Sequence, residues 1–318
     1  MGYFAIDNVN ENGISKVIVK NKKTGEYFSV IPEFGANLNE LVLRNRNENL
    51  EIIRGYKSRE EFLRLEGFKN VLMVPFPNRI ENGEYEFQGR KYKLPINEEN
   101  NRNSLHGFVY SRQFDLVERM ITDNFGAIGL KLFYDRLYTG YPFAFRLLVR
   151  FILWKNSSLE VIFVITNVDK VEIPIGVGWH PIFELGDRID RFQLKLPVKK
   201  MFVLSDRMIP NGKTVDYEYA NKPLLIGNRN FDSVFLVDNS SSRVTTEIFD
   251  VERKVTIEVW QEVGEKKFNF LQVYTPPDRR GIAIEPMSCN INAFNNKEGL
   301  IVMKPGEEIS LRCGVQLK

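Results

Sequence analysis

The amino-acid sequence is dominated by short runs of β-branched and aromatic residues, separated by turn-forming clusters and with almost no helical pattern. The 24 Phe and 12 Tyr among 318 residues favour strands. Strands that follow one another without alternating helices form antiparallel sheets, so we predict an all-β fold, a large antiparallel β-sandwich with very little helix. The predicted strands include residues 16–20, 27–31, 38–43, 84–87, 91–94, 114–120, 128–134, 145–153, 159–166, 192–196, 233–237, 244–249, 255–260, 268–274, 282–285 and 309–315.

One stretch has the pattern of a helix. Ser58 and Glu61 have the spacing of a capping box and apolar residues follow them, so we predict a helix over residues 58–66 that ends at Gly67. Residues 205–230 carry the least pattern, and we expect them to form a long surface excursion. Since no internal repeat, low-complexity segment or linker interrupts the chain, we expect residues 1–318 to form a single domain.

Charge and cysteine content argue against several classes of function. Lys and Arg total 44 against 41 Asp and Glu, and this formal charge of +3 does not indicate a nucleic-acid partner. Cys289 and Cys313 are scattered, so we expect buried, reduced thiols rather than a disulfide framework or a metal cluster. The N-terminus lacks signal-peptide features, and the most apolar run, residues 143–154, is too short to span a bilayer and contains Arg146 and Arg150. We therefore expect a cytoplasmic protein without a membrane partner.

The two histidines of the chain occupy similar places. His180 follows a long β-type run and precedes Pro181, which cannot continue a central strand, and His106 precedes Gly107 at the close of a loop rich in Asn and Glu. Side chains at such positions are held on a rigid frame and remain reachable. Each imidazole could instead cap a turn for packing reasons. Because both lie at Gly-containing loop ends, we predict that they meet at one site.

A carboxylate completes the candidate set. Glu285 ends a short apolar run and is followed by Pro286. A glutamate buried at such a position has its pKa raised toward neutrality and can accept or donate a proton. The alternative interpretation is an ordinary solvated charge, since most glutamates are exposed.

Taken together, these motifs resemble the aldose 1-epimerase (galactose mutarotase) family. The resemblance covers most of the chain, in order. It rests on Asn78-Arg79-Ile80 with Gly83, Phe87, Gly89, Tyr92 and Leu94 after it, on Asn103 to Gly107, on His180-Pro181-Ile182-Phe183, on Ile284-Glu285-Pro286, on Asn292 to Asn295, and on Pro305-Gly306-Glu307.

The resemblance implies a galactose mutarotase-like supersandwich with an open sugar-binding cleft, so the expected single domain would be an aldose-1-epimerase-like catalytic domain. It implies that Glu285 is the general base and His180 the general acid. It further implies that His106, Arg79 and Asn78 bind the sugar. Phe231 to Phe235 resembles a segment that supplies a carboxylate for sugar hydroxyls, which adds Asp232 as a weaker candidate.

The chain departs from the family pattern just before the second histidine. Many members have a polar Thr-Asn run there, whereas this chain has Gly176-Val177-Gly178-Trp179, which leaves the sugar preference open. Trp179 is therefore a candidate substrate-binding residue that could stack on the apolar side of a pyranose, or else a core residue.

The residue types fit the chemistry independently. Interconverting the anomers of an aldohexose needs a base for the anomeric hydroxyl and an acid for the ring oxygen, which Glu and His can supply, so we expect no cofactor and no metal. The expected partner is a small-molecule sugar, bound by a monomer or homodimer. The alternatives are a hexose-6-phosphate mutarotase, which would need a cluster of cations, and a non-catalytic carbohydrate-binding protein on the same scaffold. Arg79, Lys91 and Arg102 alone do not indicate a phosphate site.

Overall fold

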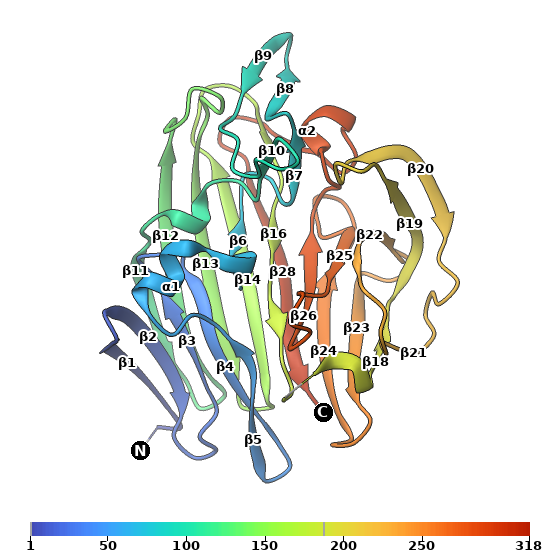
Figure 1. Ribbon diagram of the computed structural model, residues 1–318. Coiled ribbons are helices and arrows are strands. Elements are labelled where there is room, and N and C mark those ends of the chain that lie inside the picture. Colours follow the sequence, from blue (N-terminus) through green and yellow to red (C-terminus); the bar gives the residue numbers. More distant parts are fainter. Residues whose placement is uncertain (1, 187) are drawn as a thin grey trace.

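The computed structural model describes residues 2–186 and 188–318 (Figure 1). Two large antiparallel sheets dominate it, which confirms the predicted all-β sandwich. Within the described ranges, the first sheet has thirteen strands. Its main path runs β1 (Phe4–Glu11), β2 (Ile14–Asn21), β3 (Tyr27–Ile31), β4 (Asn37–Asn45), β5 (Glu48–Arg54), β17 (Ile182–Phe183), β26 (Ile282–Met287), β25 (Phe270–Tyr274), β22 (Asp232–Val237), β19 (Val198–Leu204) and β20 (Pro210–Asp216). Off this path, β16 (Gly178–Trp179) pairs with β26, and β6 (Leu72–Met73) pairs with β16.

The second sheet has nine strands in the described part of the chain. Their order is β11 (Asp115–Ile121), β12 (Phe125–Asp135), β13 (Ala144–Trp154), β14 (Ser158–Asn167), β28 (Glu308–Leu317), β24 (Val255–Glu262), β23 (Arg243–Asp250), β18 (Phe192–Lys195) and β21 (Leu224–Leu225). Three small ribbons complete the strands: β7 (Arg79–Glu81) with β10 (Asn103–Leu105), β8 (Glu84–Phe87) with β9 (Arg90–Lys93), and β15 (Ile173–Ile175) with β27 (Ile301–Met303). The β8–β9 ribbon projects at one end of the two sheets (Figure 1).

Helix is scarce, as predicted. The described residues contain the α-helices α1 (Arg59–Arg64) and α2 (Ala293–Asn296), and the 3₁₀ turns η1 (Glu66–Phe68), η2 (Val109–Ser111) and η3 (Ile189–Arg191). Ser58 caps α1 by accepting a 3.2 Å hydrogen bond from the Glu61 backbone N–H. The helix ends before the predicted Gly67 because Leu65 adopts a left-handed conformation with φ of 49°. No helix within residues 2–186 and 188–318 has the length and apolar character needed to cross a membrane.

The segment predicted as a surface excursion is partly regular. Residues 205–230 contain β20, which pairs with β19 at the edge of the first sheet, and β21, which pairs with β18. The residues of β20 are exposed except for the first, so the segment does lie at the surface. β20 was not predicted because an edge strand without a buried face lacks the alternation of apolar and polar residues that indicates a half-buried strand.

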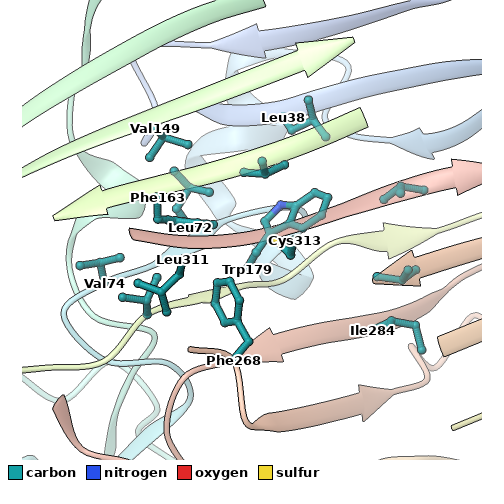
Figure 2. Close-up of a cluster of buried hydrophobic side chains, with 14 of the residues drawn as sticks. Leu38, Leu72, Val74, Val149, Phe163, Trp179, Phe268, Ile284, Leu311 and Cys313 are labelled. Carbon is teal, nitrogen blue, oxygen red and sulfur yellow. The ribbon is translucent and has the colours of Figure 1, made fainter. Parts of the chain in front are cut away.

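The hydrophobic core lies between the two sheets (Figure 2). Trp179 and Ile284 from the first sheet pack there with Leu311 and Cys313 from the second. Both cysteines are free and buried, as predicted. Since successive side chains of a strand point to opposite faces, placing Ile284 in the core turns Glu285 to the other face of the first sheet. That face carries the candidate site.

Candidate active site

A cavity of about 200 Å³ lies over the middle of the thirteen-stranded sheet. Six of the seven residues predicted for the site line it, which brings together segments more than two hundred residues apart in the sequence. The lining residues are Gly67, Phe68, Asn78, Arg79, Leu105, His106, His180, Asp232, Gln272, Tyr274 and Glu285.

His180 and Glu285 form a buried pair at this cavity. Their side chains are 6% and 2% exposed, and His180 Nε2 lies 3.4 Å from Glu285 Oε1. Burial raises the pKa of Glu285 well above its ordinary value, and the nearby Asp232 carboxylate adds to this rise. Burial lowers the pKa of His180 to about 4. Burial therefore favours the neutral form of both groups, so a single proton shared by the pair resides on Glu285 rather than on His180.

The backbone fixes both members of the pair. His180 lies between β16 and β17, and it donates its backbone N–H to Val71 O and accepts from Asn70 N–H, each at 3.0 Å. Glu285 lies within β26, directly opposite Gln272 of β25. The predicted strand end at Glu285 is therefore wrong, because β26 continues through Pro286 to Met287. On the side of β26 away from β25, β17 pairs with the first two residues of the strand and β16 pairs only with the last. Position 286 therefore has no partner strand on that side, and a proline, which lacks a backbone N–H, is tolerated there.

His106 stands beside His180 on a tight turn. Its φ is +63°, and its backbone N–H donates to Asn78 O at 2.8 Å. The next residue, Gly107, is required for the turn, because a Cβ there would lie 2.3 Å from Val74 O. The His106 ring packs edge-on against Phe68, with centroids 4.9 Å apart, and against His180 at 5.2 Å. Burial lowers the pKa of His106 well below its ordinary value, so this imidazole is neutral.

Arg79 forms an ion pair with Glu98, a residue that was not predicted for the site. Its Nη2 donates to Glu98 Oε1 at 2.8 Å and its Nε to Glu98 Oε2 at 2.9 Å, a two-pronged pairing. The two side chains are only 12% and 16% exposed. Burial acts to raise the pKa of Glu98, but the hydrogen bonds from Arg79 hold it below its ordinary value. Arg79 Nη1 also donates to Asn78 Oδ1 at 3.2 Å, which orients the Asn78 amide at the cavity.

Asp232 and Gln272 form another part of the cavity wall. Asp232 begins β22 and is exposed at the rim, and its Oδ1 accepts a 2.7 Å hydrogen bond from Gln272 Nε2. The surrounding protein raises the pKa of the Asp232 carboxyl by desolvation. Within the described residues, the buried Gln272 Oε1 and Glu285 Oε2 have no hydrogen-bond partner. Two unsatisfied polar oxygens beside one another suit a ligand that brings hydroxyl groups, which can both donate and accept.

Trp179 is the predicted site residue that the structure places elsewhere. Its side chain is fully buried, packs in the core between the sheets and does not line the cavity (Figure 2). The stacking role is therefore corrected to a core role. The physical reason is the alternation along the chain, since His180 faces the cavity and its neighbour must face the other way.

Several lining residues were not predicted from the sequence, among them the polar or aromatic Gln272, Tyr274 and Phe68. The signal for Gln272 and Tyr274 was their place in the predicted strand 268–274, next to the strand that carries Glu285. Phe68 gave no such signal. Among the described residues, no group of three or more His, Cys, Asp or Glu side chains could hold a metal ion.

The fold is that of the galactose mutarotase-like proteins. A galactose mutarotase-like protein from Clostridium acetobutylicum has a TM-score of 0.88 over 99% of this chain and 98% of its own, at 22% identity. Galactose 1-epimerase from Lactobacillus acidophilus has a TM-score of 0.80 over 99% of each chain, at 15% identity. In sequence, the uncharacterised protein YihR of Escherichia coli is 29% identical over 89% of this chain and 88% of its own length. The aldose 1-epimerase family model matches residues 18–316, and the chain belongs to that family.

Proposed function

We propose that this protein is a mutarotase that interconverts the α and β anomers of a free aldohexose by acid/base ring opening and closing. The observation that carries the proposal is the buried pair of His180 and Glu285, whose facing atoms are 3.4 Å apart at a cavity lined by other polar side chains. A proton donor and a proton acceptor that face one small cavity are what this reaction requires.

The reaction needs no net proton exchange with water. Glu285 as carboxylate takes the proton of the anomeric hydroxyl, and imidazolium His180 gives its proton to the ring oxygen, while the bond between C1 and the ring oxygen breaks and C1 becomes a carbonyl. Rotation about C1–C2 and reversal of both proton transfers close the ring as the other anomer. On the return, Glu285 is the acid and His180 the base.

The roles require the single proton of the pair to move from Glu285 to His180 when the sugar binds. This transfer leaves the net charge of the pair unchanged. Sugar hydroxyls that donate to the carboxylate stabilise its ionised form and so favour the transfer. Because the two titrations are coupled, the pair as a whole, rather than either residue, determines the pH range of activity.

The remaining side chains provide groups for sugar hydroxyls. We assign this role to Arg79, His106, Asn78 and Asp232, which line the same cavity. Arg79 is the one arginine or lysine among the described lining residues, and Glu98 balances its charge. A phosphate group would meet no free cation there, so the cavity favours a free sugar over a hexose 6-phosphate.

Polarimetry tests the proposal. Freshly dissolved α-glucose, α-galactose and their 6-phosphates are followed with and without the protein, with Glu285→Gln as the control for acid/base catalysis. We expect the free sugars to equilibrate faster with the protein than in buffer alone. Binding of these sugars without acceleration would favour a carbohydrate-binding protein, and faster turnover of a 6-phosphate would favour the hexose-6-phosphate mutarotase.

A further inference from the structure

An arginine from outside the cavity holds the loop that supplies Glu98. Arg207 lies in the turn between β19 and β20, and its guanidinium donates to the Asn101 carbonyl from Nε at 3.0 Å and from Nη2 at 2.9 Å. It also donates to Asn82 Oδ1 at 2.9 Å and to Glu81 Oε1 at 3.2 Å. Arg207 therefore ties the ribbon of β7 and β10 to the edge of the large sheet.

The loop of residues 98–103, hereafter the Glu98 loop, connects Arg207 to the carboxylate of Glu98. Asn101 Nδ2 donates to Glu98 Oε1 at 3.1 Å, and Asn103 Nδ2 donates to Glu98 Oε2 at 2.9 Å. Asn103 also donates to the Arg207 carbonyl at 3.2 Å. Both oxygens of Glu98 are thus oriented by the residues that Arg207 contacts, and the same oxygens accept the bonds from Arg79.

The turn that carries Arg207 is itself rigid. Ser205 donates its backbone N–H to Ile209 O at 2.8 Å and Met208 donates to Ser205 O at 2.9 Å, which closes the turn. The preceding strand, β19, pairs with β22, the strand that begins with Asp232. One wall of the cavity and the anchor of the Glu98 loop therefore belong to the same sheet.

We propose that Arg207 and Glu98 are positioning residues that hold the Arg79 guanidinium at the cavity wall. The inference rests on the proposed function, in which Arg79 binds the sugar. A long arginine side chain loses much conformational entropy when it is fixed. If the guanidinium is already oriented before the sugar binds, this entropy loss does not reduce the binding affinity. Glu98 supplies the orientation, and Arg207 keeps Glu98 in place while remaining outside the cavity.

A double-mutant cycle with Arg79 tests the proposal, using the full chain and a free hexose that the wild type turns over. We expect Arg207→Met and Glu98→Gln each to raise KM about tenfold and to change kcat by less than about threefold, because they disturb a binding group and not the proton-transfer pair. We expect Arg207→Met to raise KM no further once Arg79→Met is present. Lys213→Met, an exposed substitution on β20 of the same hairpin, is the matched control and should leave both constants unchanged.

Two results would overturn the positioning role. One is an unchanged KM in Arg207→Met. The other is an equal loss in the wild-type and Arg79→Met backgrounds, which would mean that Arg207 supports the fold in general. Circular dichroism and thermal unfolding of each variant would check the fold directly.

If the wild type accelerates no sugar, the proposed function fails and calorimetric titration of glucose and galactose replaces kinetics. Weaker binding in Arg207→Met only when Arg79 is present would still support the positioning chain, and binding unaffected by Arg207→Met would reject it.

Discussion

His180 Nε2 and Glu285 Oε1 face each other across 3.4 Å, and burial moves their pKa values in opposite directions, down to about 4 for His180 and well up for Glu285. The pair consequently holds one proton at pH values between the lowered pKa of His180 and the raised pKa of Glu285. Below about pH 4 it gains a second proton and has no base, and above the raised pKa of Glu285 it loses its last proton and has no acid.

The first prediction is a pH profile of kcat/KM with its acid limb near the pKa of about 4 of His180 and its basic limb above the ordinary pKa range of a glutamate, where Glu285 ionises. The profile is measured by polarimetry in buffers of constant ionic strength. The outcome that would contradict it is an acid limb near pH 6.5, the ordinary value for histidine, since His180 would then not be desolvated.

Asp232 provides a second prediction, because its negative charge helps to raise the pKa of Glu285. Replacing Asp232 with Asn removes that charge, so Glu285 ionises at a lower pH and the basic limb shifts downward. KM should rise as well if Asp232 binds a sugar hydroxyl. Asp216→Asn, on an 87% exposed side chain of β20, is the control and should move neither quantity. A basic limb that stays in place would show that Asp232 does not influence Glu285.

Glu285→Gln should lower kcat by at least about a hundredfold while sugar binding is largely kept, because the amide preserves the shape and cannot accept the proton. Stopped-flow polarimetry gives kcat, and calorimetric titration gives the affinity. Glu247→Gln on β23 of the other sheet serves as the control. Residual activity within about tenfold of the wild type, equivalent to roughly 1.4 kcal/mol of barrier, would exclude Glu285 as the general base.

The same substitution should stabilise the fold at high pH. The folded chain keeps Glu285 protonated where the unfolded chain has lost that proton, so stability of the wild type falls as pH rises from about 4.5 toward the raised pKa. Glu285→Gln lacks this loss, so at pH 8 its free energy of unfolding should exceed that of the wild type, and the difference should vanish near pH 4. Denaturant unfolding at both pH values measures it. A difference independent of pH would refute the argument.

The two histidines should differ in kinetics. His180→Asn should mainly lower kcat, because it removes the proposed acid, whereas His106→Asn should raise KM as well as lower kcat, because it removes the neutral imidazole that we propose binds the sugar. Initial-rate measurements over a range of sugar concentrations separate the two constants. Equal effects on kcat alone from both variants would reject this division of roles.

The fold class and six of the residues that line the cavity could be predicted because each has a local signal. Strand and turn composition indicated the sandwich, and short motifs marked His106, His180 and Glu285. The core role of Trp179 was also within reach, since alternation along a strand separates it from His180. By contrast, Glu98 and Arg207 had no local signal. Their proposed positioning role depends on contacts between distant parts of the chain: Glu98 contacts Arg79, 19 residues away, and Arg207 contacts Asn101, 106 residues away. Composition and periodicity do not report such contacts.

The placement of Glu285 within β26 also bears on how such a protein can change its substrate. Glu285 belongs to β26, which lies inside the large sheet and pairs with β25 on one side and β17 on the other. Arg79, His106 and the Glu98 loop belong to short ribbons and turns outside that sheet. Insertions and substitutions are tolerated better in such connections than in central strands. The part of the cavity formed by Arg79, His106 and the Glu98 loop can therefore diversify among descendants of one ancestor while Glu285 keeps its place in the sheet.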